Sequence, residues 1–348
     1  IVPAMANAEH SVEHEAEVDA LVSNVSDLII ELNVPGPPTL QIASDLHLEF
    51  FSRLPEAEQD AIMSRLIVPA APVLALLGDI GIPMHPIYRR FLLQQAERFE
   101  AVLVLAGNHE FYDVKPPGPA QKPENQTWSE FLAEQGSIKF SVEEMTFAIS
   151  AICAEHPRLH HVEKTCVRFG KQSKDAALLC TTLWSHIPED AIATVGDELN
   201  DYAMIFKRLE ESEAPDLTIA KDRQGSRLCK LRPQHTMHWH AQDVDWLRTQ
   251  ISRIQDAGCD RIGILTHHAP ALHGSSAPQH ETPGNLVNHA FCSDLAAIYN
   301  AAEVRFWAYG HTHFNNDRVV HGCRLVSNQK GYAHEDVGYQ NDFTLDMR

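Results

Sequence analysis

Closely spaced cysteine pairs are missing from this sequence. Its seven cysteines are scattered at positions 153, 166, 180, 229, 259, 292 and 323, and no two of them form a Cys-x-x-Cys pair. An odd number of scattered cysteines argues against a disulfide framework. We therefore interpret the cysteines as mostly reduced, buried residues of a cytosolic protein.

Basic residues are also few. The 348 residues include 28 lysines and arginines against 47 aspartates and glutamates, so the formal net charge is −19. Long nucleic acids and anionic membranes select basic surfaces, and we expect this chain to bind neither. A small phosphorylated substrate is still allowed, because bound metal ions invert the local electrostatic field.

Long apolar runs are absent as well. No stretch of about 18 apolar residues occurs, so the sequence predicts no membrane span. The acidic residues 1–35 lack the basic start and apolar core of a secretory signal, which favours a cytoplasmic location. The length suits one large α/β domain with insertions.

Five short apolar runs are present, and each of them ends in polar residues. Strands that alternate with helices through short connections predict a parallel sheet with right-handed crossovers. Side chains just past the carboxyl ends of such strands face one crevice. The predicted strands 40–44, 73–77, 101–105, 262–266 and 305–309 lead to Asp45 and His47, Asp79, Asn108 and His109, His267, and His311 and His313.

The N-terminal residues 1–38 are predicted to form an extension of a domain that spans 39–348. Apolar residues at three-four spacing predict an amphipathic helix over 8–32, and the prolines and glycine of 35–38 predict a stiff linker. We expect the helix to dock on the body of the protein. A homodimer contact through its apolar stripe is the alternative.

Three further helices are predicted in the second half of the chain, and one of them spans 240–256. Residues 187–238 are interpreted as a variable insertion that caps or borders the crevice, with a helix near 197–210. Another helix is predicted over 286–299.

The polar residues at the five strand ends have the chemistry of a metal centre. Carboxylate, amide and imidazole ligands together suit manganese, iron or zinc better than calcium. Two such ions roughly 3.5–4 Å apart hold a bridging hydroxide and clamp a phosphoryl group for in-line attack. His109 neighbours the candidate ligand Asn108 and is free to supply a proton to the leaving oxygen.

This arrangement resembles the calcineurin-like metallophosphoesterase superfamily. The matching blocks, in chain order, are Asp45-x-His47, Gly78-Asp79, Gly107-Asn108-His109-Glu110, His267 and Gly310-His311-x-His313. The resemblance covers residues 39–330 and implies a four-layer αββα sandwich, in which two mixed β-sheets are flanked by helices.

The resemblance also implies roles for individual residues. One metal ion would be held by Asp45, His47, Asp79 and His313, and the other by Asp79, Asn108, His267 and His311, with Asp79 as the bridge. His109 would be the acid or the transition-state stabiliser.

Five more residues are candidates for orienting the ligands or shaping the substrate pocket. They are Glu110, His268, His186, Asn200 and Asp201. The Thr-Thr-Leu-Trp stretch at 181–184 and the Asn-Asp-Tyr stretch at 200–202 resemble an uncharacterised microbial branch of the superfamily, and a structural role for both is the alternative.

The predicted activity is hydrolysis of a small phosphomonoester or phosphodiester, including a nucleotide or cyclic nucleotide, by metal-bound hydroxide. The arginines that protein Ser/Thr phosphatases carry in the corresponding motifs are absent around Gly78-Asp79 and before Gly107, which disfavours that branch. The alternative is a non-catalytic metal-binding scaffold of the same fold. Measuring both bound metal and turnover distinguishes the two.

Overall fold

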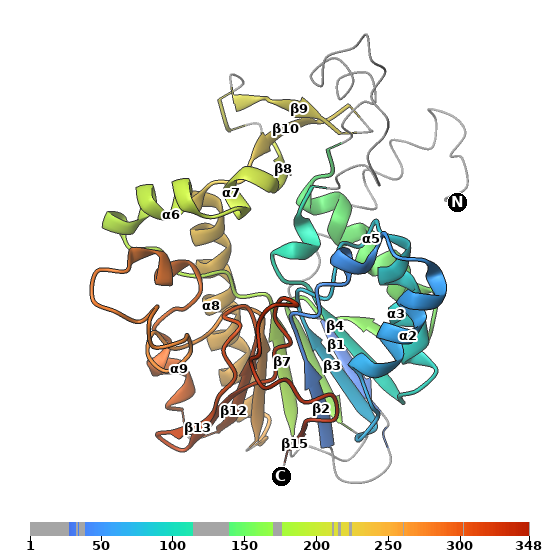
Figure 1. The fold of residues 1–348 in the computed structure, drawn as a ribbon. Coiled ribbons are helices and arrows are strands. Elements are labelled where there is room, and N and C mark those ends of the chain that lie inside the picture. The colour runs from blue at the N-terminus through green and yellow to red at the C-terminus, as the bar shows by residue number, and fades with distance from the viewer. Residues whose placement is uncertain are drawn as a thin grey trace.

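Two mixed β-sheets packed face to face form the centre of the molecule (Figure 1). The computed structural model describes residues 28–32, 34, 39–113, 139–169, 176–210, 212–214, 217–222, 225–259, 261–301 and 303–347. The five-stranded sheet has the order β15 (Thr344–Asp346), β2 (Thr39–Ala43), β3 (Val73–Leu77), β4 (Ala101–Leu105) and β5 (Leu159–His161). The seven-stranded sheet has the order β1 (Leu28–Leu32), β6 (Thr165–Phe169), β7 (Ala177–Thr181), β11 (Ile262–Thr266), β12 (Val304–Tyr309), β14 (Cys323–Ser327) and β13 (Asp317–Val320).

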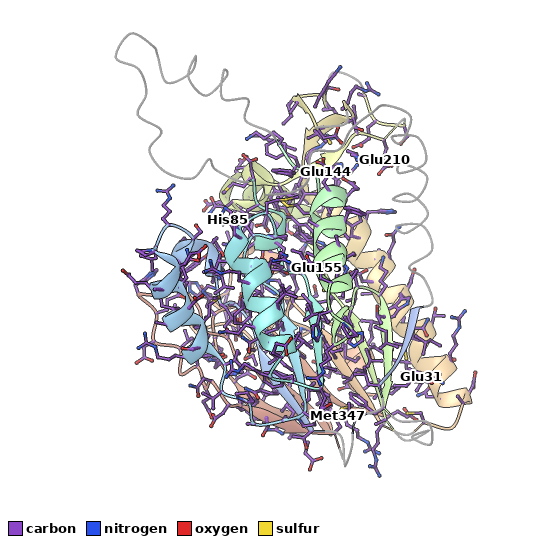
Figure 2. The ribbon with its side chains drawn as sticks, turned by 90° about the vertical axis from the view of Figure 1, so that its right-hand side faces the viewer. Glu31, His85, Glu144, Glu155, Glu210 and Met347 are labelled. Carbon is purple, nitrogen blue, oxygen red and sulfur yellow. The ribbon has the colours of Figure 1, made fainter. Side chains whose placement is uncertain are left out.

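Helices cover the outer face of each sheet. The helices α2 (Glu56–Leu66), α3 (Pro86–Ala96) and α5 (Val142–Ala154) lie on the five-stranded sheet, and Figure 2 looks onto this face. The helices α8 (Pro233–Asp256) and α9 (Ala296–Tyr299) pack on the seven-stranded sheet. The result is the four-layer αββα sandwich, and the predicted fold class is confirmed. None of the described helices is both long and apolar enough to cross a membrane.

The strand β3 shows why the central strands are continuous apolar runs. Leu74 and Leu76 pack in the core beneath the helices, whereas Val73, Ala75 and Leu77 pack in the core between the two sheets. Successive strand residues point to opposite faces, and both faces are covered here. A strand in this position must therefore be apolar at every residue.

The predicted helix over 8–32 is wrong at its C-terminal end. Residues Leu28–Leu32 form β1, which pairs in parallel with β6 at the edge of the seven-stranded sheet. Ile29 and Glu31 are exposed, while Leu32 is buried, so the segment has the two-residue period of an edge strand. Residues 8–27 lie outside the described residues, and the homodimer contact stays a prediction.

Two of the three helices predicted in the second half of the chain are also wrong as continuous elements, whereas the helix predicted over 240–256 lies within α8. The segment 197–210 is divided among α6 (Ile192–Glu198), α7 (Asp201–Met204) and β8 (Phe206–Arg208). The strand β8 joins β10 (Arg227–Lys230) and β9 (Ala220–Lys221) in a small antiparallel sheet, which stands above the sandwich in Figure 1.

The segment 286–299 is broken in the same way. A 3₁₀ helix, Leu286–Ala290, is separated from α9 because the intervening backbone bonds to the loop after β11. There Ser293 N donates to Ala269 O at 2.9 Å. Apolar periodicity does not reveal such a tertiary backbone contact.

Candidate metal centre

The polar strand ends come from both sheets rather than from the rim of one. The strands β2, β3 and β4 of the five-stranded sheet end just before Asp45, Asp79 and Asn108. The strands β11 and β12 of the seven-stranded sheet end just before His267 and His311. Because the two sheets pack face to face, these carboxyl ends meet at one edge of the sandwich.

Strained backbone holds the candidate ligands at this edge. Five of them, none a glycine, have left-handed backbone: Asp45 (φ 55°), His47 (φ 50°), Asp79 (φ 54°), His311 (φ 70°) and His313 (φ 47°). Such a conformation costs about 1–3 kcal/mol per residue and clusters at functional sites. Sharp turns right after the strands explain how consecutive polar residues reach one point.

Two glycines make room for the imidazole of His267. A Cβ atom on Gly78, whose φ is +86°, would lie 2.5 Å from His267 Nδ1. A Cβ atom on Gly107 would lie 2.3 Å from Asp79 Oδ1 and 2.6 Å from the His267 ring. These glycines therefore permit close packing of side chains as well as tight turns.

A first group of candidate ligands consists of Asp45, His47 and His313. Their ligand atoms all lie within 4.8 Å of one another. His47 Nε2 is 3.1 Å from His313 Nε2, which in turn is 3.4 Å from Asp45 Oδ1. Burial raises the pKa of Asp45, but the hydrogen bond and charge of His313 outweigh it and lower the pKa to about 2.

Carboxylates fix the orientation of both histidines in the first group. His47 Nδ1 lies 3.0 Å from Glu49 Oε1, and His313 Nδ1 lies 2.7 Å from Glu335 Oε2. Ionised carboxylates only accept hydrogen bonds, so each Nδ1 carries the proton. The Nε2 lone pairs are left free and point at each other, as in metal-binding histidines.

A second group consists of Asp79, His267 and His311, and its ligand atoms also lie within 4.8 Å of one another. His267 Nε2 is 3.4 Å from Asp79 Oδ1 and 3.1 Å from Asn108 Oδ1. His267 Nδ1 donates to the backbone oxygen of Leu77 at 2.8 Å, which again leaves Nε2 free.

Asp79 connects the two groups. Besides its place in the second group, it lies within 4.8 Å of His47 of the first group and of His109. It is 2% exposed. A carboxylate in this position has one oxygen available to each side.

An unpartnered nitrogen indicates that the second group suits a cation. His311 Nε2 is buried and has no hydrogen-bond partner among the described residues. A buried polar atom without a partner costs about 1–3 kcal/mol. Together with the Nε2 of His267 and the carboxylate of Asp79, this donor set fits borderline transition metals such as manganese, iron or zinc.

His109 lies beside the two groups with one ring nitrogen held and the other directed inward. Its Nδ1 lies 3.0 Å from Glu49 Oε1, and its Nε2 is 4.0 Å from Asp79 Oδ2 and 3.4 Å from the Tyr332 hydroxyl. The ring stacks on Tyr112 at 4.1 Å. Burial lowers the pKa of His109, but Asp79 and Glu49 raise it to about 9.

Glu110 stabilises the loops that carry the ligands. Its carboxylate accepts hydrogen bonds from the backbone amides of Gly107 at 2.7 Å, Asp79 at 2.9 Å and Ile80 at 2.8 Å. Burial and the charge of Asp79 raise the pKa of Glu110 to about 8, while these amide donors oppose the shift. It thus ties the turn after β3 to the turn after β4.

Asp201 reaches the site from the insertion. Its Oδ1 accepts hydrogen bonds from Asn108 Nδ2 at 2.8 Å and from the Tyr112 hydroxyl at 2.7 Å. This contact holds the amide of Asn108 with its oxygen toward His267. Asn200 lines the adjoining cavity.

Of the two remaining candidate residues, His268 lies near the ligand groups and His186 does not. His268 lies 4.1 Å from the ring of His311, and its Nδ1 is 2.9 Å from Ser185 Oγ. His186 is exposed and is not among the residues that line the cavity, so the structure does not bring it to the site. In the Thr-Thr-Leu-Trp stretch, Thr182 Oγ1 bonds to Ala106 O at 2.8 Å and thereby links the two sheets.

Three residues of the site were missed by sequence reasoning. Glu49 and Glu335 hold the histidines of the first group, and Tyr332 lies between them. Glu49 stands two residues after His47, which was an available signal. Glu335 and Tyr332 belong to an irregular C-terminal segment, and no motif marks them.

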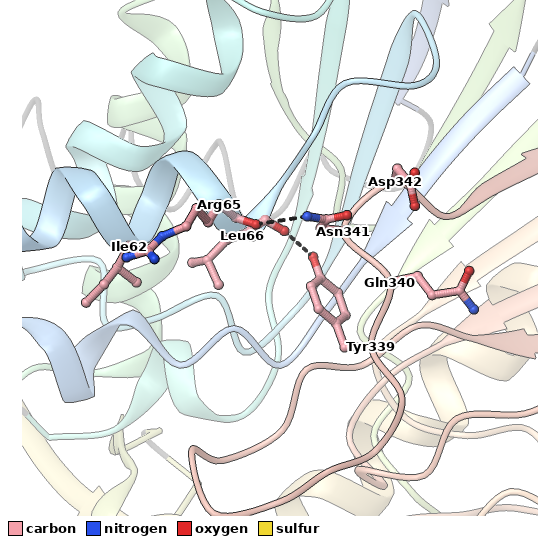
Figure 3. A pocket seen from close by; sticks show the side chains of 7 residues that line it. All are labelled: Ile62, Arg65, Leu66, Tyr339, Gln340, Asn341 and Asp342. Atoms are coloured by element: carbon pink, nitrogen blue, oxygen red, sulfur yellow. Dashed lines mark hydrogen bonds between the residues drawn. The ribbon is translucent and has the colours of Figure 1, made fainter.

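A cavity of about 340 Å³ opens onto both ligand groups. Its wall includes Asp79, His109, His311 and His313 on one side and residues of the insertion and of the segment 276–291 on the other. A larger hollow of about 520 Å³ lies between α2 and residues 339–342 (Figure 3). None of the residues that line this larger hollow belongs to either ligand group.

The chain has the calcineurin-like metallophosphoesterase fold, as the sequence predicted, and carries candidate metal-binding clusters of aspartate and histidine. No family model matches the sequence.

Two solved structures and one protein sequence are similar to this chain. The solved structure of the phosphopantetheinyl hydrolase PptH from Mycobacterium tuberculosis matches with a TM-score of 0.51 and 16% identity, over 86% of this chain and 91% of that chain. The calcineurin-like phosphoesterase YfkN from Bacillus subtilis matches more weakly, with a TM-score of 0.32 and 12% identity over 83% of this chain and 80% of that chain. The uncharacterized protein L509 of Acanthamoeba polyphaga mimivirus is 25% identical over 304 residues, which are 85% of this chain and 92% of that protein.

Proposed function

We propose that this chain is a phosphoesterase that uses two metal ions to hydrolyse a small phosphoester. The observation that carries the proposal is the arrangement of His47, His267 and His313. Each has its Nδ1 held by an oxygen acceptor. The Nε2 atoms of His267 and His313 each lie 3.4 Å from a carboxylate oxygen, and the Nε2 of His47 lies 3.1 Å from that of His313. Two bound ions would supply Lewis acidity and a water of lowered pKa at this place.

The protein side chains divide the remaining work. The first ion would be held by Asp45, His47, Asp79 and His313. The second would be held by Asp79, Asn108, His267 and His311. His109 is neither a member of those sets nor exposed to bulk water, and its Nε2 faces the cavity. We assign it the protonation of the leaving oxygen.

Glu49 positions this proton donor. Because it accepts from His109 Nδ1, it keeps the proton-bearing Nε2 directed at the cavity. The same oxygen accepts from His47 Nδ1 at 3.0 Å, so the proton donor and a ligand of the first ion share one anchor. This common anchor fixes the donor relative to the reacting phosphoryl group.

The test combines metal content with turnover of p-nitrophenyl phosphate and bis-p-nitrophenyl phosphate. Manganese-loaded His109→Ala is expected to keep two ions per chain and to lose turnover by about 10²–10⁴-fold, the usual contribution of a general acid. His238→Ala, an exposed histidine of α8, is the matched control.

Two results would count against the proposal. Normal turnover by His109→Ala would remove the proposed role of that residue. Two tightly bound ions without turnover of either ester would favour the alternative, a metal-binding scaffold.

A further inference from the structure

A second hollow adjoins the metal centre, and no described residue of the insertion lines it. It has a volume of about 350 Å³ and is lined mainly by rings and apolar groups: Leu46, His47, Phe50, Phe51, Lys330, Gly331, Tyr332, Ala333 and His334. We call it the aromatic slot. No role is assigned to it by the proposed chemistry.

Tyr332 is the wall between the slot and the cavity, because it lines both. Its ring is 4.7 Å from the ring of His47 and 4.6 Å from that of His313. Its hydroxyl lies 3.4 Å from His109 Nε2, the proposed proton donor. A leaving oxygen near His109 is therefore next to the side chain that the slot and the cavity share.

The rings in the slot are arranged to receive another ring. Phe50 meets Tyr332 edge to face at 5.6 Å, yet Phe50 is 61% exposed. His334 stacks parallel to Tyr332 at 5.9 Å with an interplanar angle of 17°. Exposed aromatic faces of this kind favour planar partners through offset or edge-to-face contacts.

The cavity on the other side of Tyr332 has a different chemistry. Its wall carries Asn200, Asn285 and Asn288, together with the carboxylates of Glu198 and Glu335. Amide groups suit a polar, hydrogen-bonding substituent. The carboxylates disfavour a second negative charge on the bound phosphoryl group.

We propose, resting on the phosphoesterase function above, that the substrate is a phosphodiester with two unlike ester groups. The planar aromatic group of the leaving alcohol occupies the aromatic slot, and the polar group that stays on phosphorus occupies the amide-lined cavity. Water adds its oxygen to phosphorus, the bond to the leaving oxygen breaks, and His109 gives that oxygen a proton. The proton that water loses restores the one that His109 gave. The products are a phosphomonoester and an aromatic alcohol.

Binding of non-hydrolysable phosphonates tests the slot without any turnover. Phenylphosphonate is expected to bind the manganese-loaded protein about tenfold more tightly than methylphosphonate, the factor that one stacked ring contributes. Phe50→Ala should reduce this preference to near unity, and Val319→Ala, an exposed apolar residue of β13, should preserve it. Calorimetry measures both affinities in wild-type protein and in the two variants.

Turnover of esters that share one leaving group tests the cavity. Thymidine 5′-(p-nitrophenyl phosphate) is expected to be the best substrate, methyl p-nitrophenyl phosphate weaker, and p-nitrophenyl phosphate the weakest. Val287→Phe, which fills the cavity, should raise KM for the thymidine ester about tenfold and leave the methyl ester within twofold, because only the larger group needs the space.

The outcomes separate this proposal from the general function. If esters are hydrolysed but the preference for phenylphosphonate is unchanged in Phe50→Ala, the proposed role of the slot is wrong and the phosphoesterase function stands. Phenylphosphonate binding that depends on Phe50, without hydrolysis of any ester, would reject the phosphoesterase function and with it the assignment of a leaving group. A change of sedimentation mass in Phe50→Ala would mark the slot as a contact between copies, and would overturn the proposal.

Discussion

The two candidate ligand groups are built from similar side chains but supported differently. In the first group, the charged carboxylates Glu49 and Glu335 hold the histidines, and the side chain of His313 is 14% exposed. In the second group, a backbone carbonyl holds His267, whose side chain is fully buried. Carboxylate partners make a ligating imidazole more basic than a carbonyl does. We therefore expect the first group to bind its ion more tightly.

The largest loss of metal binding and turnover is expected from a substitution of Asp79, which lies close to both ligand groups. Asp79→Asn removes the charge that both groups share, so both ions should be weakened together and turnover should fall by about 10³-fold or more, since a metal ion contributes several kcal/mol. Elemental analysis and ester hydrolysis measure the two losses. Asp245→Asn, whose side chain is 81% exposed on α8, is the control. Loss of only one ion would show that Asp79 does not bridge.

Glu335→Gln changes the first ligand group only. The substitution removes the charge behind His313 while preserving size, so affinity for one ion should fall by about 10–100-fold. The other ion should be bound as in the wild type. A two-site calorimetric titration with Mn²⁺ resolves the two affinities. Equal weakening of both would mean that the groups do not act separately.

Asp201→Asn makes the corresponding change on the other side. It releases the Asn108 amide from its charged acceptor, and the affinity for the second ion should fall by about tenfold. The same titration detects this as a change in the weaker site. Asp197→Asn, on the exposed side of α6, controls for loss of charge in the insertion. A change in the tighter site would contradict the assignment of Asn108.

The smallest effect is expected from a carboxylate contact outside the site. Arg89 of α3 pairs with Glu155, which follows α5 and is labelled in Figure 2, with a distance of 2.8 Å from Nε to Oε1. Both side chains are well exposed, so Arg89→Ala should cost less than about 1 kcal/mol of unfolding free energy. Chemical denaturation measures this cost, and metal affinity should not change. A larger loss would mean that the pair fixes how the two helices pack.

The strand ends could be predicted because their signal is local. A five-residue apolar run such as Val73–Leu77 is buried on both faces, and its abrupt stop at Gly78 and Asp79 marks the turn. Apolar residues gave a wrong prediction at residues 28–32, where a helix was expected and a strand is found. Their apolar spacing fits a helix when the chain is considered alone, and pairing with β6 decides for a strand.

The residues that hydrogen-bond to the candidate ligands could not be predicted, because the fold brings them together from distant parts of the sequence. Glu335 reaches His313 across 22 residues of chain, and Asp201 reaches Asn108 across 93. Asp201 was a candidate only through its place in the Asn-Asp-Tyr stretch. The sequence also placed all ligands on one sheet, since strand alternation does not show that the chain moves to a second sheet after β5.

That change of sheet has a mechanical consequence. Asp45 and Asp79 follow strands of one sheet, while His267 and His313 follow strands of the other. A bound ion would therefore act as a clasp across the sandwich and resist sliding of one sheet over the other. Since a ligand stabilises the state that binds it, the clasp would slow amide hydrogen exchange deep in β3 and β11.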